Sequence, residues 1–200
     1  LSHPEQYLAP LLSAMETGGN IELHAQGQQV DGVPGSLPYP HNLVLIGTVN
    51  MDETTHGLSD KILDRAHVME FWDIDIPRFP GWQSTRLDPA TVELLKSVLS
   101  ELMQCLRPVR LHFGWRTLGD VIGYVEAATG DAQFSPLQAL DHVIYAKILP
   151  KLRGESTAAL QQTFNIVERV LRQHQLSSSA DKVSALRLDL TELGSARFWR

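Results

Sequence analysis

The stretch from residue 41 to 74, HNLVLIGTVNMDETTHGLSDKILDRAHVMEFWDI, constrains the fold of this chain more than any other part of the sequence. Residues 43–46 are continuously apolar, a run that is too short for a helix core and typical of a parallel strand covered on both faces. The run ends in Gly47-Thr48-Val49-Asn50. We therefore predict a buried strand with Asn50 at its carboxyl end, where open α/β sheets bind their ligands.

The second half of this stretch predicts a helix and another strand. Ser59 can cap a short helix from about residue 60 to 66, and the apolar residues 68–74 resume a strand. Arg65 closes the helix. The pattern thus places one polar amide at a strand tip and one arginine fifteen residues later at a helix end.

These two strings resemble the second half of an AAA+ nucleotide hydrolase module, in the branch that contains McrB and the dynein-related ATPases. Leu45-Ile46-Gly47-Thr48-Val49-Asn50 is similar to the strand that carries the sensor 1 asparagine, and residues 58–65, LSDKILDR, are similar to the helix that carries the arginine finger. The family aspartate after the asparagine falls on Glu53 in a gapless match, or on Asp52 with a one-residue shift. The loop NMDETT departs from the family's Asn-Thr-x-Asp-Arg-Ser, and the usual arginine cluster is reduced to Arg65.

The resemblance implies catalytic roles for three residues. Asn50 would place the attacking water in line with the γ-phosphate, with Glu53 holding the loop or the water. Arg65 would reach into the neighbouring subunit's site, where such an arginine changes the rate by a factor on the order of 10³–10⁵. The alternatives are an asparagine that turns the chain, a solvated acidic loop, and an arginine that is a surface charge beside an intrahelical pair of Lys61 and Asp64.

The rest of the chain predicts helices after a proline-rich linker. We expect residues 1–76 to be the C-terminal portion of an α/β core, 77–87 to be the linker and 88–200 to be an all-α lid domain. The predicted fold class is α/β, namely the end of a P-loop AAA+ core with a parallel sheet followed by a helical lid. Helices are expected over 4–16, over 88–106, from the string 113–118 to about 129, from 136 to Pro150 and over 155–175. A short helix or tail is expected over 184–200, and a loop at Ser177-Ser178-Ser179.

A second string of the lid, Phe113-Gly114-Trp115-Arg116-Thr117-Leu118, resembles the "fGyRtl" string of McrB-like lids. In that resemblance Arg116 is the sensor 2 arginine and contacts the nucleotide. An arginine in the first turn of a helix opposes the macrodipole, which suggests that it binds an anion together with the free amides. Otherwise Arg116 would pair with Asp120, one turn later. Trp115 would stack near the base or pack as an ordinary aromatic side chain.

Composition excludes several other classes. The chain of 200 residues has a net charge of −6, so a small helical DNA-binding protein is a poor fit. A single cysteine and eight dispersed histidines give no metal-ligand spacing. No apolar run approaches the roughly 18 residues of a membrane span, and the first residues are not a signal peptide, which favours a cytoplasmic protein.

The sequence contains no G-x-x-x-x-G-K-[ST] loop and no apolar strand ending in paired acids. The resemblance therefore implies a piece that starts after the Walker B strand and is inactive alone. The whole enzyme would hydrolyse ATP or GTP with Mg²⁺, whose ligands would lie in the missing half. It would work as a homo-oligomeric, hexameric ring, with a partner nuclease and DNA as expected partners in restriction. The alternative is a non-catalytic AAA-like scaffold that binds other proteins.

Overall fold

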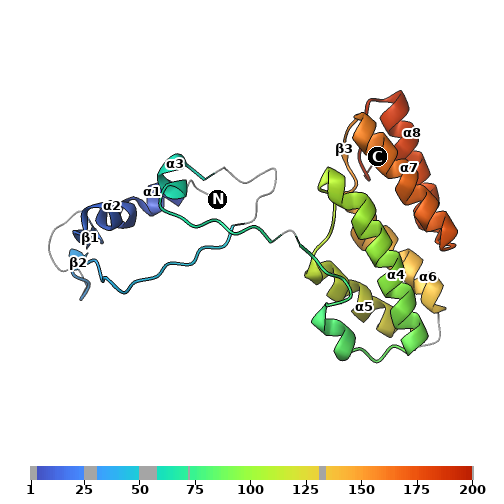
Figure 1. The fold of residues 1–200 in the computed structure, drawn as a ribbon, viewed down its shortest axis with the longest axis horizontal. Coiled ribbons are helices and arrows are strands. Elements are labelled where there is room, and N and C mark those ends of the chain that lie inside the picture. The colour runs from blue at the N-terminus through green and yellow to red at the C-terminus, as the bar shows by residue number, and fades with distance from the viewer. Residues whose placement is uncertain (1–3, 25–30, 50–57, 72, 131–133, 200) are drawn as a thin grey trace. The chain divides into compact units, whose positions relative to one another are not determined.

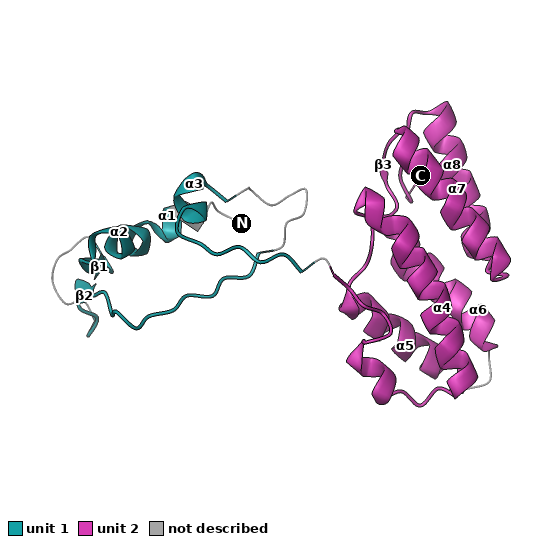
Figure 2. Ribbon diagram, in the orientation of Figure 1, with its two compact units in different colours: residues 1–71 teal, residues 72–200 magenta. Residues whose placement is uncertain are grey.

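The computed structural model describes residues 4–24, 31–49, 58–71, 73–130 and 134–199. The chain divides into two compact units, residues 1–71 and 72–200, which Figure 2 shows in separate colours. Each unit is described by itself below.

The first unit contains short elements joined by extended chain. They are α1 (Pro4–Tyr7), α2 (Ala9–Thr17), β1 (Asn20–Glu22), β2 (Ser36–Pro38) and α3 (Asp60–Leu63). Gly18 ends α2 in the left-handed conformation, at φ 65°, and its N–H donates to the carbonyl of Ala14. The two strands form an antiparallel pair in which Ile21 faces Leu37.

The predicted parallel sheet is wrong for the part of the chain that the structure describes. Residues 43–49 and 66–71 are extended but belong to no strand, and both described sheets consist of two antiparallel strands. The apolar side chains of these segments are exposed, with Val44 at 79%, Ile46 at 89% and Phe71 at 88%. A buried parallel strand requires a neighbouring strand and a cover on each face, and the described residues supply neither. The fold class is therefore mainly helical instead of α/β.

The second unit is a packed group of helices (Figure 1). Its long helices are α4 (Pro89–Leu106), α5 (Trp115–Gly130), α6 (Pro136–Val143), α7 (Ala158–Gln173) and α8 (Ser177–Glu192). A π-helix, η3 (Ile144–Ile148), continues α6 directly. Short 3₁₀ turns and a two-stranded pair complete the unit, namely η1 (Pro80–Gln83), η2 (Arg107–Val109), η4 (Leu149–Lys151), β3 (Gly154–Glu155) and β4 (Ser195–Ala196).

Side-chain caps explain where three of these helices begin. Asp88 accepts the N–H of Thr91 at 3.0 Å at the start of α4. Ser135 and Gln138 form a capping box at the start of α6, and Thr157 caps α7. The helices predicted from residue 88, from 136 and from about 155 are thus confirmed as α4, α6 and α7.

The core of the second unit lies where the apolar stripes of its helices meet. Leu99 and Leu102 of α4 are completely buried, as are Leu118 of α5, Leu140 of α6 and Phe164 of α7. Helices α7 and α8 run side by side as a hairpin, as Figure 1 shows. In the described residues no helix is long and apolar enough to cross a membrane.

The predicted loop at the three consecutive serines is wrong, because α8 begins at Ser177. Serine favours helix starts as well as loops, and a partner distant in sequence decides between them here. The buried carboxylate of Asp141, in α6, accepts the N–H groups of Ser178 and Ser179, each at 2.9 Å. These bonds satisfy amides that the first turn of a helix leaves without partners.

Candidate functional site

The residues expected to act on the γ-phosphate fall mostly outside the described part of the chain. Asn50, Asp52 and Glu53 all lie outside the described residues.

Arg65 follows α3 and is held inside the first unit. Its guanidinium donates to the carboxylate of Glu16, in α2, at 2.6 Å and to the carbonyl of Lys61 at 2.8 Å. The Arg65 side chain is 26% exposed. In the expected alternative Arg65 is a surface charge beside an intrahelical pair of Lys61 and Asp64, whereas in the structure its guanidinium pairs with a carboxylate from another helix. An arginine finger would have to leave Glu16 to reach a neighbouring subunit.

Trp115 and Arg116 open α5 in the second unit. Trp115 is 46% exposed, and its ring lies 5.9 Å from that of Phe79 in a tilted arrangement, so part of it packs and part faces solvent. Arg116 is exposed and forms no ion pair with any other described residue. Asp120, which could have paired with it one turn later, instead accepts from Lys147 at 2.9 Å.

Two lysines from the η3–η4 segment reach the first turns of α5. Lys151 donates to the hydroxyl of Thr117 at 3.1 Å, and Lys147 pairs with Asp120. Burial lowers the pKa of Lys151; Asp120 raises it and Lys147 lowers it, both to a smaller extent. We call Arg116, Thr117, Asp120, Lys147 and Lys151 the α5 cluster. It holds three cations and one carboxylate.

The charge of Lys151 also acts on a nearby histidine, His112. Burial lowers the pKa of His112, and the charges of Arg107 and Lys151 lower it further. The positive end of the α5 macrodipole adds to these charges. The α5 cluster can therefore attract an anion, and its arginine offers the planar fork that matches phosphate oxygens.

A shallow hollow of about 360 Å³ adjoins the α5 cluster. It is lined by Asp120, Tyr124, His142, Val143, Ala146 and Lys147. The hollow lies between α5 and the α6–η3 segment. Its size is at the lower end of the range for small-molecule sites.

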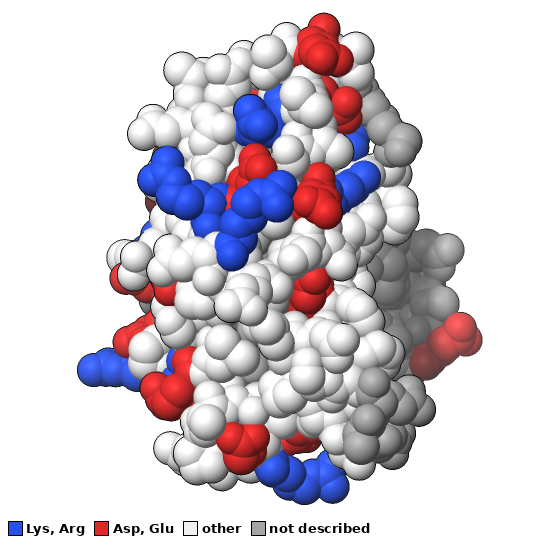
Figure 3. Space-filling model, turned by 90° about the vertical axis from the view of Figure 1, so that its right-hand side faces the viewer, with Lys and Arg blue, Asp and Glu red and all other residues white. Residues whose placement is uncertain are grey.

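Two other arginines of the second unit, Arg172 and Arg187, are neutralised locally. Glu168 accepts from both Arg172 and Arg187 at 3.1 Å, and Arg172 also donates to Asp181. Figure 3 shows one face of the molecule on which lysine and arginine side chains gather with acidic ones between them. Such a mixed surface lacks the continuous basic stripe of a nucleic-acid interface. The unpaired Arg116 is thus distinct from these locally neutralised arginines.

The sequence points to Arg116 but not to the contact of Lys147 and Lys151 with α5. In the sequence Lys147, Lys151 and Arg153 form a small basic cluster at a helix end, a pattern that favours pairing with the helix dipole and solvation. The four-residue spacing of Lys147 and Lys151 was the available signal, since it places two cations on one helix face. The partners Thr117 and Asp120 lie about thirty residues away, so contact with α5 could not be inferred from spacing.

Residues 76–195 match the family described as Domain of unknown function (DUF8727). The chain belongs to this family. The matched range runs from just before η1 into β4 and includes the α5 cluster. No curated protein and no solved structure matches the chain. The family therefore coincides with the helical unit, and its description assigns no activity to it.

Proposed function

We propose that the chain is part of an AAA+ nucleoside triphosphatase of the McrB or dynein-related type, in which the DUF8727 helical unit acts as a lid that responds to the nucleotide. The observation that supports this most is Arg116, an exposed arginine in the first turn of α5 with no ion-pair partner among the described residues. It stands at the position where the resemblance expects sensor 2.

The surroundings of Arg116 fit a phosphate. An unpaired arginine at a helix N-terminus costs free energy because the macrodipole is positive there, and an anion removes that cost. The carboxylate of Asp120 is occupied by Lys147, so it does not neutralise Arg116. In this proposal Arg116 contacts the phosphates, and Trp115, which is half exposed beside it, lies near the base.

The first unit would supply the hydrolytic groups. Asn50 would orient the attacking water, with Glu53 beside it, and Arg65 would act across a subunit boundary after leaving Glu16. The exposed apolar residues of 43–49 and 66–71 are surface that a larger assembly would cover. An oligomeric ring of six subunits fits that requirement.

The remaining parts of the proposal follow from the resemblance. The nucleotide is ATP or GTP with Mg²⁺, the location is the cytoplasm, and the work of the ring is restriction or translocation on DNA with a partner nuclease. The mixed charge of the face in Figure 3 suggests that any contact with DNA is made elsewhere on the ring.

The test is ATP and GTP hydrolysis by the complete gene product, with Asn50→Ala, Arg65→Ala and Arg116→Ala as variants. Arg78→Ala is the matched control, because Arg78 is an exposed arginine whose ion pair is with nearby Asp75. We expect losses of about 10³-fold or more for Arg65→Ala and about 10- to 100-fold weaker nucleotide binding for Arg116→Ala. Mixing the Asn50→Ala and Arg65→Ala proteins should restore part of the activity if Arg65 acts across subunits.

A second candidate is a non-catalytic AAA-like scaffold that binds proteins, which the Arg65–Glu16 ion pair favours because it holds the expected finger within its own unit. The same assay separates the two. If the complete gene product neither binds nor hydrolyses ATP or GTP, the enzyme proposal is wrong and the scaffold remains. If Arg116→Ala binds nucleotide as tightly as Arg78→Ala does, the assignment of the lid is wrong.

A further inference from the structure

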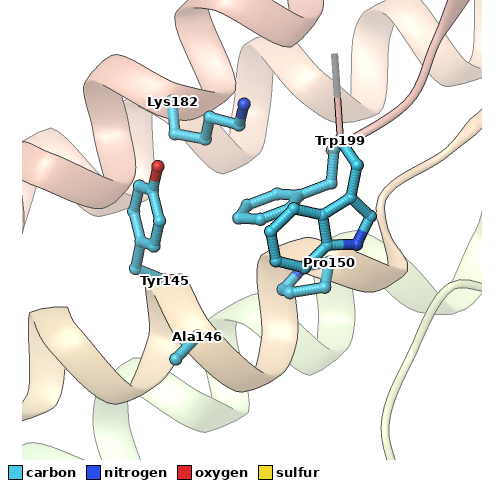
Figure 4. Close-up of a pocket in the computed structure, with 6 residues that line it drawn as sticks. Tyr145, Ala146, Pro150, Lys182 and Trp199 are labelled. Atoms are coloured by element: carbon cyan, nitrogen blue, oxygen red, sulfur yellow. The ribbon is translucent and has the colours of Figure 1, made fainter.

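The second unit carries an aromatic hollow that the proposed nucleotide chemistry does not use. It has a volume of about 320 Å³ and is lined by Tyr145, Ala146, Pro150, Lys182, Phe198 and Trp199. Figure 4 shows Tyr145 on one side, Trp199 on the other, Ala146 below and Lys182 reaching in from the opposite helix. Trp199 is 80% exposed, although a tryptophan of a folded unit is usually well covered.

The walls of the hollow are rings in fixed edge-to-face contact. The ring centre of Phe198 lies 4.7 Å from that of Trp199, at an interplanar angle of 83°. It lies 5.4 Å from the ring centre of Tyr145, at an interplanar angle of 72°. Phe198 is 6% exposed, so the ring that both neighbours contact is itself held in the core. The hollow is therefore formed before any partner arrives, so binding would cost little reorganisation.

The π-helix η3 supplies two of the residues that line the hollow. Tyr145 and Ala146 both belong to η3, and π-helices occur frequently at functional sites. The buried neighbours Ile144 and Ile148 hold η3 in the core on its other side.

The positive charge of Lys182 at the hollow favours a partner with a negative charge. The ammonium of Lys182 lies 4.6 Å from the centre of the Phe198 ring and forms no ion pair with another described residue. Because Lys182 already occupies the negative face of that ring, a second cation would be repelled. A carboxylate beside an apolar group would satisfy the ammonium and the rings together.

We propose that this hollow docks an acidic peptide segment of a partner protein, which inserts one aromatic or proline side chain between Tyr145 and Trp199 and places a carboxylate on Lys182. A free small molecule fits less well, since ligand sites bury 70–90% of a drug-sized ligand's surface and the Trp199 wall is largely in solvent. A peptide can bury one side chain in such a hollow while its polar groups contact the solvent-exposed rim. The inference does not depend on nucleotide binding.

The first experiment selects random heptapeptides displayed on phage for binding to the 200-residue chain, after depletion on the Lys182→Gln, Trp199→Ala double variant. We expect enriched sequences that carry an aromatic residue or proline next to Asp or Glu. If no sequence survives the depletion, or if Lys and Arg dominate the survivors, the proposal is wrong.

The second experiment measures the affinity of the most enriched peptide, labelled with fluorescein, by fluorescence polarisation. Lys182→Gln should weaken binding about tenfold, and Trp199→Ala about thirtyfold, as expected for an aromatic hot spot. The matched controls are Lys96→Gln, which also removes a lysine from an aromatic face, and Leu193→Ala, which truncates another exposed apolar residue. Both controls should stay within about twofold of wild type, on the general behaviour of surface substitutions.

Two results of this measurement would overturn the docking site. One is that Lys182→Gln and Trp199→Ala bind the peptide as the controls do, with circular dichroism showing all variants folded. The other is that indole-3-acetate alone binds as tightly as the peptide, which would assign the hollow to a small anionic ligand.

Discussion

Replacement of Asp141 by alanine should destabilise the helical unit more than any other single change of a polar side chain that we consider. Its carboxylate lies in α6 but caps α8, through the N–H groups of Ser178 and Ser179 at 2.9 Å each. The amide of Ser179 is buried, so no water can replace the lost acceptor there. Loss of a helix cap costs about 1 kcal/mol, and a buried donor left without a partner costs about 1–3 kcal/mol.

The expected loss in the free energy of unfolding is therefore about 2–4 kcal/mol for Asp141→Ala. This corresponds to a fall in melting temperature of about 6–15 °C for a unit of this size. Asp141→Asn should lose about half as much, because its amide oxygen can still accept one N–H while its NH₂ faces the other. The hydroxyl of Ser179 donates to the backbone carbonyl of Asp141, and this bond survives both substitutions.

Urea unfolding followed by circular dichroism at the helical signal measures this effect. The control is Glu192→Ala, which removes an exposed carboxylate from the other end of α8. It should change the free energy of unfolding by less than about 0.5 kcal/mol. If Asp141→Ala unfolds at the same urea concentration as Glu192→Ala, the carboxylate does not cap α8 and the reasoning fails.

Two further groups give predictions that depend on pKa. The hydroxyl of Thr85 and the N–H of Arg86, both at 2.6 Å, lower the pKa of Glu126. A carboxylate with a lowered pKa stabilises the fold at pH values above its unfolded pKa of about 4.3. The free energy of unfolding that Glu126→Gln loses should therefore be largest at pH 7 and should vanish as the pH falls through the folded pKa. Urea titrations at several pH values measure this difference. Burial raises the pKa of the Cys105 thiol, and the charge of Glu101 raises it further. Alkylation by iodoacetamide should therefore have its pH midpoint above that of free cysteine, and Glu101→Gln should move the midpoint down; an unchanged midpoint would contradict the assigned cause.

The helices of the second unit could be predicted because their signals are local. Asp88 before Pro89 and Ser135 before Pro136 each combine a cap with a proline in the first turn, and the apolar stripes that follow have helical spacing. The start of α8 could not be predicted in this way. Its capping carboxylate is Asp141, more than thirty residues earlier, and that pairing exists only once α6 and α8 are packed.

The failed prediction of a parallel sheet has the same origin. The run 43–46 indicates an apolar segment, but a strand is defined by its neighbours, and parallel neighbours are always distant in sequence. Within the described residues neither 43–49 nor 66–71 pairs with another strand, so the apolar pattern is present without the element that it predicted. The start of the predicted helix is confirmed, since α3 begins directly after Ser59, but the helix ends at Leu63 and the Ser59 side chain forms no cap hydrogen bond.

The candidate site shows how far a motif alone can lead. The sequence placed Arg116 in the first turn of a helix because the string of residues 113–118 opens that helix, and α5 begins at Trp115. What makes that arginine a candidate anion ligand is that Asp120, its nearest possible partner, is occupied by Lys147 from η3. A spacing rule offered the pairing of Arg116 with Asp120 as an alternative, and the structure instead pairs Asp120 with a lysine distant in sequence. The charge state of the α5 cluster is therefore a property of the packed unit. Substitution of Lys147 should remove one cation of the cluster and leave Asp120 available to Arg116, and both effects should weaken the proposed anion site.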